Sequence, residues 1–289
     1  STVTSLTVGH TTPVSIADGK TLSGAITVTA GSVKLGETGT LASTISMSGG
    51  ELDADESLTL SGTLTQSGDI EIDIKAGKTI TYTGAAISLG ANKLALTGGA
   101  ASSSTFSNTN ALLLDNADSI LRLNNHVTVG SASVNVASNE NMGLKVYNSS
   151  AINSLTVAAS TYLKIKDGKT FSGATEIAED TTLILRDTGT FGSTLNLKGT
   201  LQAIANMEVS GLISVGADSA ISIPSADITL TYSGDAISLG ANTLTLSGGG
   251  RLSNTNALLL NNASSKLLLN SITVGKVSTS LANSGLDVD

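Results

Sequence analysis

Residues 22–28 read Leu-Ser-Gly-Ala-Ile-Thr-Val, and related phrases begin at Leu41 and at Leu60, so the phrase recurs at a constant step. Apolar and small polar residues alternate within each phrase, which is the two-residue period of a β-strand with one buried face. Clusters of Gly, Asn, Asp and Ser, such as residues 17–20 and 48–50, separate the phrases and are typical of tight turns. Three short strands and three turns therefore fit in one step.

A phrase that recurs at a constant step predicts coils that stack along one axis. We predict an all-β chain folded as a parallel β-solenoid (β-helix), right-handed, with about 19-residue coils that are roughly 4.8 Å apart and about 15 in number. Leu22, Leu41 and Leu60 then stack in one interior ladder, and Thr27 points outward. The alternative fold is a set of tandem antiparallel β-sandwich repeats, which also use short strands and regular turns.

A second repeat is much longer. Residues 81–92 return almost unchanged at 231–242, 150 positions later. Long tandem units indicate an array in which each unit finds its missing contacts in the next one. We therefore divide the chain into a first solenoid unit, residues 1–149, and a second unit, residues 150–289, and expect one continuous rod without a flexible linker.

The composition limits both the core and the partners. Aromatic residues make up 2% of the chain and Trp is absent, so we expect a narrow core of aliphatic ladders with little room for rings. A net charge of −8 argues against nucleic acid or an anionic membrane as a partner, because both attract cationic surfaces. The chain has no Cys, no run of 18 apolar residues and no leader-like segment, so we expect no disulfide, no thiolate metal site and no membrane insertion in this segment.

Ser, Thr and Asn fill the outward positions, since charged residues are only 13% of the chain. These polar residues suit strands and turns and can hydrogen-bond from coil to coil. We expect a set of Asn residues to form inward or turn-capping ladders: Asn92, Asn108 and Asn124 in the first unit, and Asn242, Asn254 or Asn256, and Asn270 in the second.

The duplication is a control for catalysis, because a working residue is expected in both copies. His10 aligns with Ala159 and His126 with Ser271, so neither His is kept. The acidic rows are not kept either: Asp69, Glu71 and Asp73 align with Ser219, Ile221 and Ile223, and Asp53, Asp55 and Glu56 align with Gln202, Ile204 and Ala205. We interpret these carboxylates as solvated side chains rather than as a Ca²⁺ site.

The tripeptide Gly-Lys-Thr occurs at Gly19, Gly77 and Gly168 and invites a phosphate-loop interpretation. That motif needs a Gly five residues earlier, where this chain has Val, Ile and Leu. We therefore predict turns at the solenoid corners. We expect no catalytic, cofactor-binding or metal-binding residue in the chain, and no cofactor.

The Thr-x-Thr segments at residues 79–81 and 229–231 are similar to the threonine rows of ice-binding solenoids. An ice-binding face would need such a pair on nearly every coil. The constant step of the phrases places only Thr27, Ser46 and Thr65 in register, so ice binding is a minor alternative.

Three features carry a resemblance to a class of proteins: the phrase Thr-Leu-Ser-Gly-Ala-Ile-Thr-Val at residues 21–28, the Gly-Gly turns, and the Ser-Asn-Thr-Asn-Ala-Leu segments at 107–112 and 253–258. The chain resembles autotransporter passenger regions, filamentous haemagglutinin-like adhesins and other bacterial β-strand-repeat surface proteins. The resemblance implies an extracellular or cell-surface location and a structural or adhesive role. It carries over no individual functional residue.

We therefore expect a non-enzymatic, structural or adhesive segment of an extracellular bacterial surface fibre, stalk, sheath or filament. The alternative is a polysaccharide-acting β-helix enzyme, a lyase or a hydrolase, with acidic and basic residues in a lateral groove. The only Arg residues are Arg122, Arg186 and Arg251, and the coils run on at nearly constant length without an insertion that could form groove walls. Both observations disfavour the enzyme.

End-to-end assembly is the last expectation from the sequence. Residues 285–289 match residues 143–147, and no capping helix or charged cap is found at either terminus. An uncovered coil has unpaired backbone groups above an apolar core and pairs with a surface that fits. The expected partners are a second copy of the chain, head to tail, or flanking repeats of the same polypeptide, together with cell-surface glycans or host surfaces.

Overall fold

The computed structural model describes residues 1–14, 16–279 and 285–288, which form strands and turns only. Its parallel strands stack as a β-solenoid of about 13 turns, about 21 residues apart. This confirms the predicted fold class, and the coil is longer than predicted. In the described residues, no helix is long and apolar enough to cross a membrane. The hand of the winding stays a prediction.

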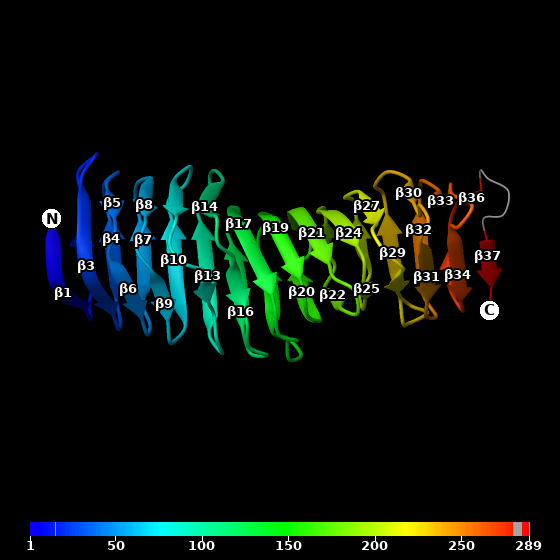
Figure 1. Cartoon of the computed structure of the whole chain (residues 1–289), viewed down its shortest axis with the longest axis horizontal. Helices are drawn as coiled ribbons and strands as arrows, with labels where there is room; N and C mark the ends of the chain where they lie inside the picture. The colour runs from blue at the N-terminus through cyan, green and yellow to red at the C-terminus, as the bar shows by residue number, and fades with distance from the viewer. Residues whose placement is uncertain (15, 280–284, 289) are drawn as a thin grey trace. The chain divides into compact units, whose positions relative to one another are not determined.

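The chain divides into two compact units, Ser1–Ser154 and Leu155–Asp289, whose boundary lies within β19 (Ser150–Val157). In each unit, a turn of the solenoid contributes one strand to each of three faces, and strands of successive turns lie side by side (Figure 1). The first face is a parallel sheet that we call sheet 1 in both units. The other two are called the second and third faces.

Sheet 1 of the first unit consists of β2 (Thr12–Val14), β4 (Ser32–Leu35), β7 (Glu51–Ala54), β10 (Ile70–Ile74), β13 (Lys93–Gly98), β16 (Ile120–Asn124) and β18 (Gly143–Val146). The second face holds β5 (Thr40–Leu41), β8 (Leu58–Leu60), β11 (Thr79–Tyr82) and β14 (Ser104–Asn108), and the third face holds β6 (Thr44–Met47), β9 (Leu64–Gln66), β12 (Ile87–Ser88) and β15 (Leu112–Leu114). Three longer strands run through both of these faces: β1 (Thr2–Val8), β3 (Thr21–Val28) and β17 (Val127–Val134).

The second unit repeats this arrangement. Its sheet 1 consists of β20 (Thr161–Ile165), β22 (Thr182–Arg186), β25 (Thr200–Ala203), β28 (Ser219–Ser222), β31 (Thr243–Ser247), β34 (Lys266–Asn270) and β37 (Gly285–Val288). Its second face holds β23 (Thr190–Phe191), β26 (Met207–Val209), β29 (Thr229–Tyr232), β32 (Arg251–Asn254) and β35 (Thr273–Val274), and its third face holds β24 (Thr194–Leu197), β27 (Ile213–Val215), β30 (Ile237–Ser238), β33 (Leu258–Leu260) and β36 (Val277–Thr279). The longer strand β21 (Thr170–Ile177) runs through both of these faces.

The predicted inside and outside positions of the first unit are confirmed. Leu22 pairs in register with Leu41, and Leu41 with Leu60, so the three form one ladder with Leu41 and Leu60 fully buried. Thr27 is exposed and lies in register between Thr7 and Ser46. Each buried Leu or Ile of such a ladder contributes about 1.5–3 kcal/mol of transfer free energy, so the stacked aliphatic rows are the main source of stability.

The core holds more rings than the expectation of little room for them suggested. Tyr82 continues the ladder after Leu60 and is buried, and its ring stacks on Phe106 with centroids 5.9 Å apart. In the second unit, Phe171 and Phe191 occupy neighbouring rungs, also 5.9 Å apart. A ring fits because its neighbour one coil away can stack against its face.

The tyrosines of the duplicated segment make the same contacts in both units. The Tyr82 hydroxyl donates to the carbonyl of Ala85 (2.8 Å) and accepts from the amide of Leu64 (3.2 Å). The Tyr232 hydroxyl likewise donates to Asp235 O (2.6 Å) and accepts from Ile213 N (3.4 Å). Burial raises the pKa of both phenols, so each remains a neutral donor that ties two successive coils together.

Coil length is not constant, contrary to the expectation from the first phrases. Among the paired residues of sheet 1, the number of residues from one coil to the next is smallest from Leu183 to Leu201 and largest from Leu94 to Leu121. The residues added in the longer coils lie in the corners between strands, such as residues 99–103. A corner can lengthen because turn residues lie outside the ladders and disturb none of their contacts.

The predicted Asn ladder is also corrected, because Asn92, Asn108 and Asn124 occupy different positions on the coil. Asn108 caps a corner: its Nδ2 donates to Asn110 O (2.7 Å) and Ser131 O (2.8 Å), and its Oδ1 accepts from Gly130 N (3.0 Å) and Ser131 N (3.2 Å). Asn254, rather than Asn256, makes the same four bonds in the second unit. The turn-capping part of the prediction is therefore confirmed for this pair.

Candidate functional site

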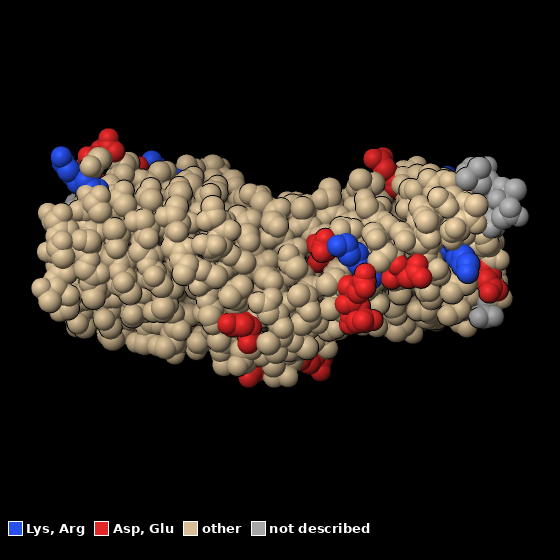
Figure 2. Space-filling view, in the orientation of Figure 1, with Lys and Arg blue, Asp and Glu red and all other residues tan. Residues whose placement is uncertain are grey.

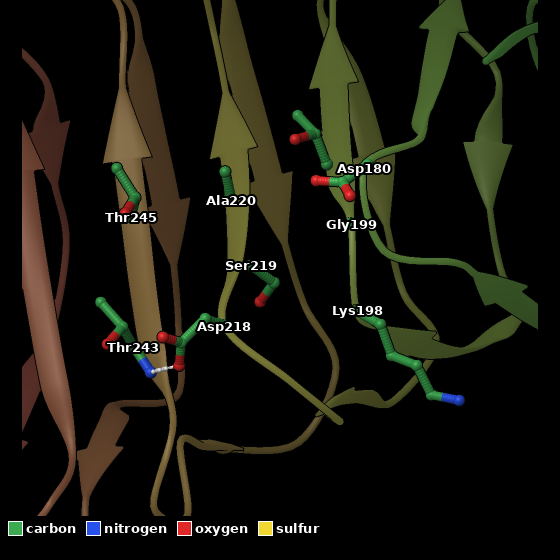
Figure 3. Close-up of a pocket in the computed structure, with 9 residues that line it drawn as sticks. Asp180, Lys198, Gly199, Asp218, Ser219, Ala220, Thr243 and Thr245 are labelled. Carbon is green, nitrogen blue, oxygen red and sulfur yellow. Dashed lines mark hydrogen bonds between the residues drawn. The ribbon is translucent and has the colours of Figure 1, made fainter. Parts of the chain in front are cut away.

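A groove is found at the same place in both units, on the outward side of sheet 1 where the chain enters its strands. In the second unit it has a volume of about 350 Å³ and crosses three neighbouring strands (Figure 3); its lining residues are Asp180, Lys198, Gly199, Thr200, Asp218, Ser219, Ala220, Thr243 and Thr245. In the first unit it has a volume of about 170 Å³, and its lining residues are Gly50, Asp69, Ile70, Glu71, Lys93 and Ala95.

The register of sheet 1 shows which groove residues are equivalent. Ile72 pairs with Leu52, and Ile221 pairs with Leu201 in the same way, so Ile221 is the structural counterpart of Ile72. Glu71 therefore corresponds to Ala220, and Asp69 corresponds to Asp218. The alignment from sequence had paired Asp69 with Ser219, one residue too far along the chain. The prediction that this acidic row keeps no carboxylate in the second unit was therefore wrong, because Asp218 is the counterpart of Asp69.

The retained aspartate has a structural role in both units. Asp69 Oδ1 accepts from the amide of Lys93 at 2.8 Å, and Asp218 Oδ1 accepts from the amide of Thr243 at 2.7 Å. Each carboxylate thus holds the first residue of the strand in the next coil. The hydrogen bond from the Lys93 amide, followed by those from its ammonium group, lowers the pKa of Asp69.

The size of the groove follows from the residue at its floor. Ala220 lies in register between Thr200 and Thr245, so a methyl group stands between two longer side chains. In the first unit, Glu71 takes the place of Ala220 and fills much of that space. The larger groove is therefore a consequence of small residues on β28.

The remaining carboxylates of the predicted acidic rows gather on sheet 1 of the first unit. Glu51 is in register with Glu71, and Asp53 with Asp73, on the outward face of β7 and β10. Desolvation is the main cause that raises the pKa of Glu51 and of Asp73, and the neighbouring carboxylates add to it. Among the residues that the structure describes, no group of three or more His, Cys, Asp or Glu is arranged to hold a metal ion.

Cations neutralise part of this acidic surface. Lys34 Nζ lies 3.1 Å from Asp53, Lys75 Nζ lies 3.5 Å from Asp55, and Lys78 binds Glu56 at 2.5 Å. These ion pairs link successive coils, and at such exposure each contributes little to stability.

The three Gly-Lys-Thr segments are turns, as predicted. Gly19, Gly77 and Gly168 have φ of 66°, 73° and 66°, in the left-handed region that glycine tolerates. Each turn is closed by a bond from the Lys amide to the carbonyl three residues earlier, at 2.9, 3.0 and 3.0 Å.

The histidines and arginines singled out in the sequence are dispersed. His10 is exposed, and His126 occupies a turn with φ of 58°, a conformation that Ser271 repeats with φ of 51°. The arginines are spread over three strands, β16, β22 and β32, and none of them lines either groove. Arg122 lies over the ring of Tyr147, with its guanidinium carbon 4.3 Å from the ring centroid.

Rows of threonine and serine cover the second and third faces of the first unit. Thr7 extends the predicted row of Thr27, Ser46 and Thr65, and a second row runs in register through Thr21, Thr40, Thr59, Thr81 and Ser107. In the second unit, Glu176 and Glu208 interrupt the equivalent rows. Figure 2 shows few charged side chains over the N-terminal part of the face in view.

The groove of the second unit was missed in the sequence, because its residues come from separate coils and form no motif. The only available signal was the small residues Ser219 and Ala220 at positions that hold Ile70 and Glu71 in the first unit. No protein-family model, no curated protein and no solved structure matches the chain.

Proposed function

We propose that this chain is a structural or adhesive segment of an extracellular bacterial surface fibre, stalk, sheath or filament, similar to autotransporter passenger regions and haemagglutinin-like adhesins. Its work in this role is to provide length and resistance to proteolysis, and it catalyses no reaction. The proposal includes end-to-end assembly, either within a longer polypeptide or between copies.

One observation carries the proposal. In each unit, equivalent residues stack in register from coil to coil, both at buried positions and at outward-facing positions. The Leu22–Leu41–Leu60 ladder and the parallel row of Thr21, Thr40 and Thr59 have the same partners above and below. A stack of this kind can be extended by further coils without a new type of contact. Sheet 1 supports this, because β37 pairs with β34 in the register that β18 adopts with β16.

The test is to image the native protein and to measure its assembly. We expect unbranched filaments or a long rod by electron microscopy, labelling of intact cells by antibodies against the chain, and slow cleavage by proteases. A dispersed monomer at high concentration, encoded without flanking repeats, would contradict end-to-end assembly. Turnover of an acidic polysaccharide would instead favour the lyase or hydrolase alternative.

A second candidate function, ice binding, is favoured by the threonine and serine rows of the first unit, which are longer than the sequence indicated. Their hydroxyl and methyl groups repeat at about 4.8 Å between coils and about 6.7 Å along a strand, a regular lattice that ordered water can match. The test is thermal hysteresis of the protein and of a Thr40→Tyr variant. Hysteresis that is absent, or that is unchanged by the substitution, would exclude this function.

A further inference from the structure

We propose that the groove of the second unit, over Ser219 and Ala220, is a binding site for a neutral saccharide. The inference deepens the adhesive part of the proposed function and rests on it. The groove spans β25, β28 and β31, and at about 350 Å³ it reaches the lower end of the volumes typical of ligand pockets, about 300–1,000 Å³. The equivalent groove of the first unit, at about 170 Å³, does not.

Polar groups of the larger groove lack protein partners that their counterparts in the first unit have. In the first unit, Asp69 is held by the ammonium group of Lys93 at 3.1 Å, and Glu71 accepts from the hydroxyl of Thr97 at 2.5 Å. In the second unit, Thr243 replaces Lys93, so Asp218 keeps only the bond from the Thr243 amide among the described residues (Figure 3).

Other polar groups of the groove are also available to bind a ligand. Lys198 points away from Asp218 and Thr243 (Figure 3) and binds Glu176 at 3.1 Å, so it does not neutralise the groove carboxylates. Asp180 and the Thr245 hydroxyl have no protein partner in the part of the chain that the structure describes. Ser219 Oγ is shielded from solvent without any hydrogen bond to the described residues, and it lies on the side of β28 that also carries the buried Ile221.

The chemistry of these groups selects the ligand. Carboxylates only accept hydrogen bonds, whereas Ser and Thr hydroxyls both donate and accept. Sugar hydroxyls complement both kinds of group, because each can donate to a carboxylate and accept from a hydroxyl. Ala220 and the methyl groups of Thr200 and Thr245 offer a small apolar patch to the C–H face of a sugar ring.

Charge disfavours anionic ligands in this groove. Asp180 and Asp218 repel an acidic saccharide or a phosphate. A calcium ion takes about 6–8 oxygen ligands. The described residues hold no cluster of three carboxylates arranged for a metal. A neutral saccharide supplies hydroxyl donors to both carboxylates and adds no further negative charge to the groove.

The experiment follows the backbone amides of the full-length protein by NMR while neutral disaccharides are added: cellobiose, lactose, mannobiose and diacetylchitobiose. We expect saturable shifts of the Thr243, Thr245 and Ala220 amides with at least one of them, and none with digalacturonate. Ala220→Leu should weaken binding by about tenfold or more, because it fills the floor of the groove. Asp180→Asn, which tolerates the φ of 57° at this position, should weaken it several-fold.

The matched control is Ser222→Leu, on the same outward face of β28 but outside the groove. It should bind like the wild type, and thermal unfolding will show that all variants are folded. The proposal is overturned if no neutral disaccharide gives saturable shifts, if Ala220→Leu binds as well as Ser222→Leu, or if digalacturonate or calcium chloride alone shifts these amides. Filaments without saccharide binding would leave the structural role standing and remove only this site.

Discussion

Ser43 and Ser119 of the first unit are both fully buried, and their hydroxyls have different surroundings. Ser119 Oγ donates to Gly90 O (2.6 Å) and accepts from Asn116 N (3.1 Å), whereas Ser43 Oγ has no hydrogen-bond partner among the described residues. Ser265 and Ser193 repeat this contrast in the second unit. Burying a hydroxyl costs free energy that only a hydrogen bond recovers.

We therefore expect Ser119→Ala to lower the free energy of unfolding by about 1–3 kcal/mol, because it leaves Gly90 O and Asn116 N without their partner. Ser43→Ala should be neutral or slightly stabilising. Urea unfolding of the two variants measures the difference. Equal losses would mean that Ser43 has a partner, such as an ordered water.

The alternation of the 22–28 phrase leads to a second pair of substitutions. Leu41→Asp places an unpaired carboxylate in the fully buried ladder between Leu22 and Leu60, and we expect it to cost at least about 3 kcal/mol. Thr27→Asp on the exposed face should change stability by less than about 0.5 kcal/mol. Thermal unfolding of both variants would contradict the assignment of the two faces if their losses were similar.

Residue identity alone could place Leu41 inside and Thr27 outside, because a two-residue period depends only on neighbours in the chain. It could not pair Asp69 with Asp218. Residues 224–228 lead from Ile223 to β29, whereas residues 75–78 lead from its counterpart Ile74 to β11, so the repeat offset is 149 before this turn and 150 after it. An insertion of one residue in a turn is invisible in the strands on either side, and only their pairing reveals it.

At the scale of the element, β7 and β10 place like charges side by side. Glu51 and Glu71 are in register, as are Asp53 and Asp73, and like charges directly opposite one another destabilise a sheet. The pKa values of Glu51 and Asp73 are raised in the folded protein, first by desolvation and then by these neighbours. The folded state therefore binds protons more tightly than the unfolded state at these two groups.

This gives a stability that falls as pH rises. The contribution of Glu51 and Asp73 is fully present below about pH 4, the range of their unfolded pKa values, and is lost as pH rises through their higher folded values. The lowered pKa values of Asp69 and Glu176 act oppositely, because their contribution is lost as pH falls through values below that range. The two effects therefore occupy different pH windows.

We expect the double variant Glu51→Gln, Asp73→Asn to melt about 1–3 °C higher than the wild type at pH 7 and to match it near pH 4. Melting curves between pH 4 and pH 8 test this. The control is Glu208→Gln in the second unit, which bonds to Ser233 and has no carboxylate in register. If the double variant followed the wild type at every pH, the like-charge pairs would have no effect on folding.

Elements were easier to predict than their spacing. Strands and turns follow from local alternation and from turn residues, so β3, β6 and the Gly19 turn are found where the sequence places them. Coil length was not predictable from the 22–66 phrases, because the corner at residues 99–103 adds residues that carry no period. Little room for rings such as Tyr82 was expected from the composition, which does not tell whether a neighbouring ring can stack.

At the scale of the whole molecule, each coil contacts mainly the coils before and after it, so stability is a sum of coil and neighbour terms. A defect should therefore remain local. We expect Leu41→Asp to reduce hydrogen-exchange protection in β4 to β9 and to leave β31 and β34 of the second unit protected. Exchange measured by mass spectrometry tests this, and a uniform loss across both units would indicate a single cooperative block.

The unequal coils have a consequence for the folding chain. If every coil had the same length, a newly made segment could dock one rung too early or too late and still find nearly identical neighbours, because the ladders repeat the same few side chains. With steps as unequal as Leu183 to Leu201 and Leu94 to Leu121, a misplaced segment has too much or too little chain to close its corner. Corner length thus helps to specify where each coil docks in the stack. A variant with its corners trimmed to give coils of equal length would be prone to docking its coils in the wrong register.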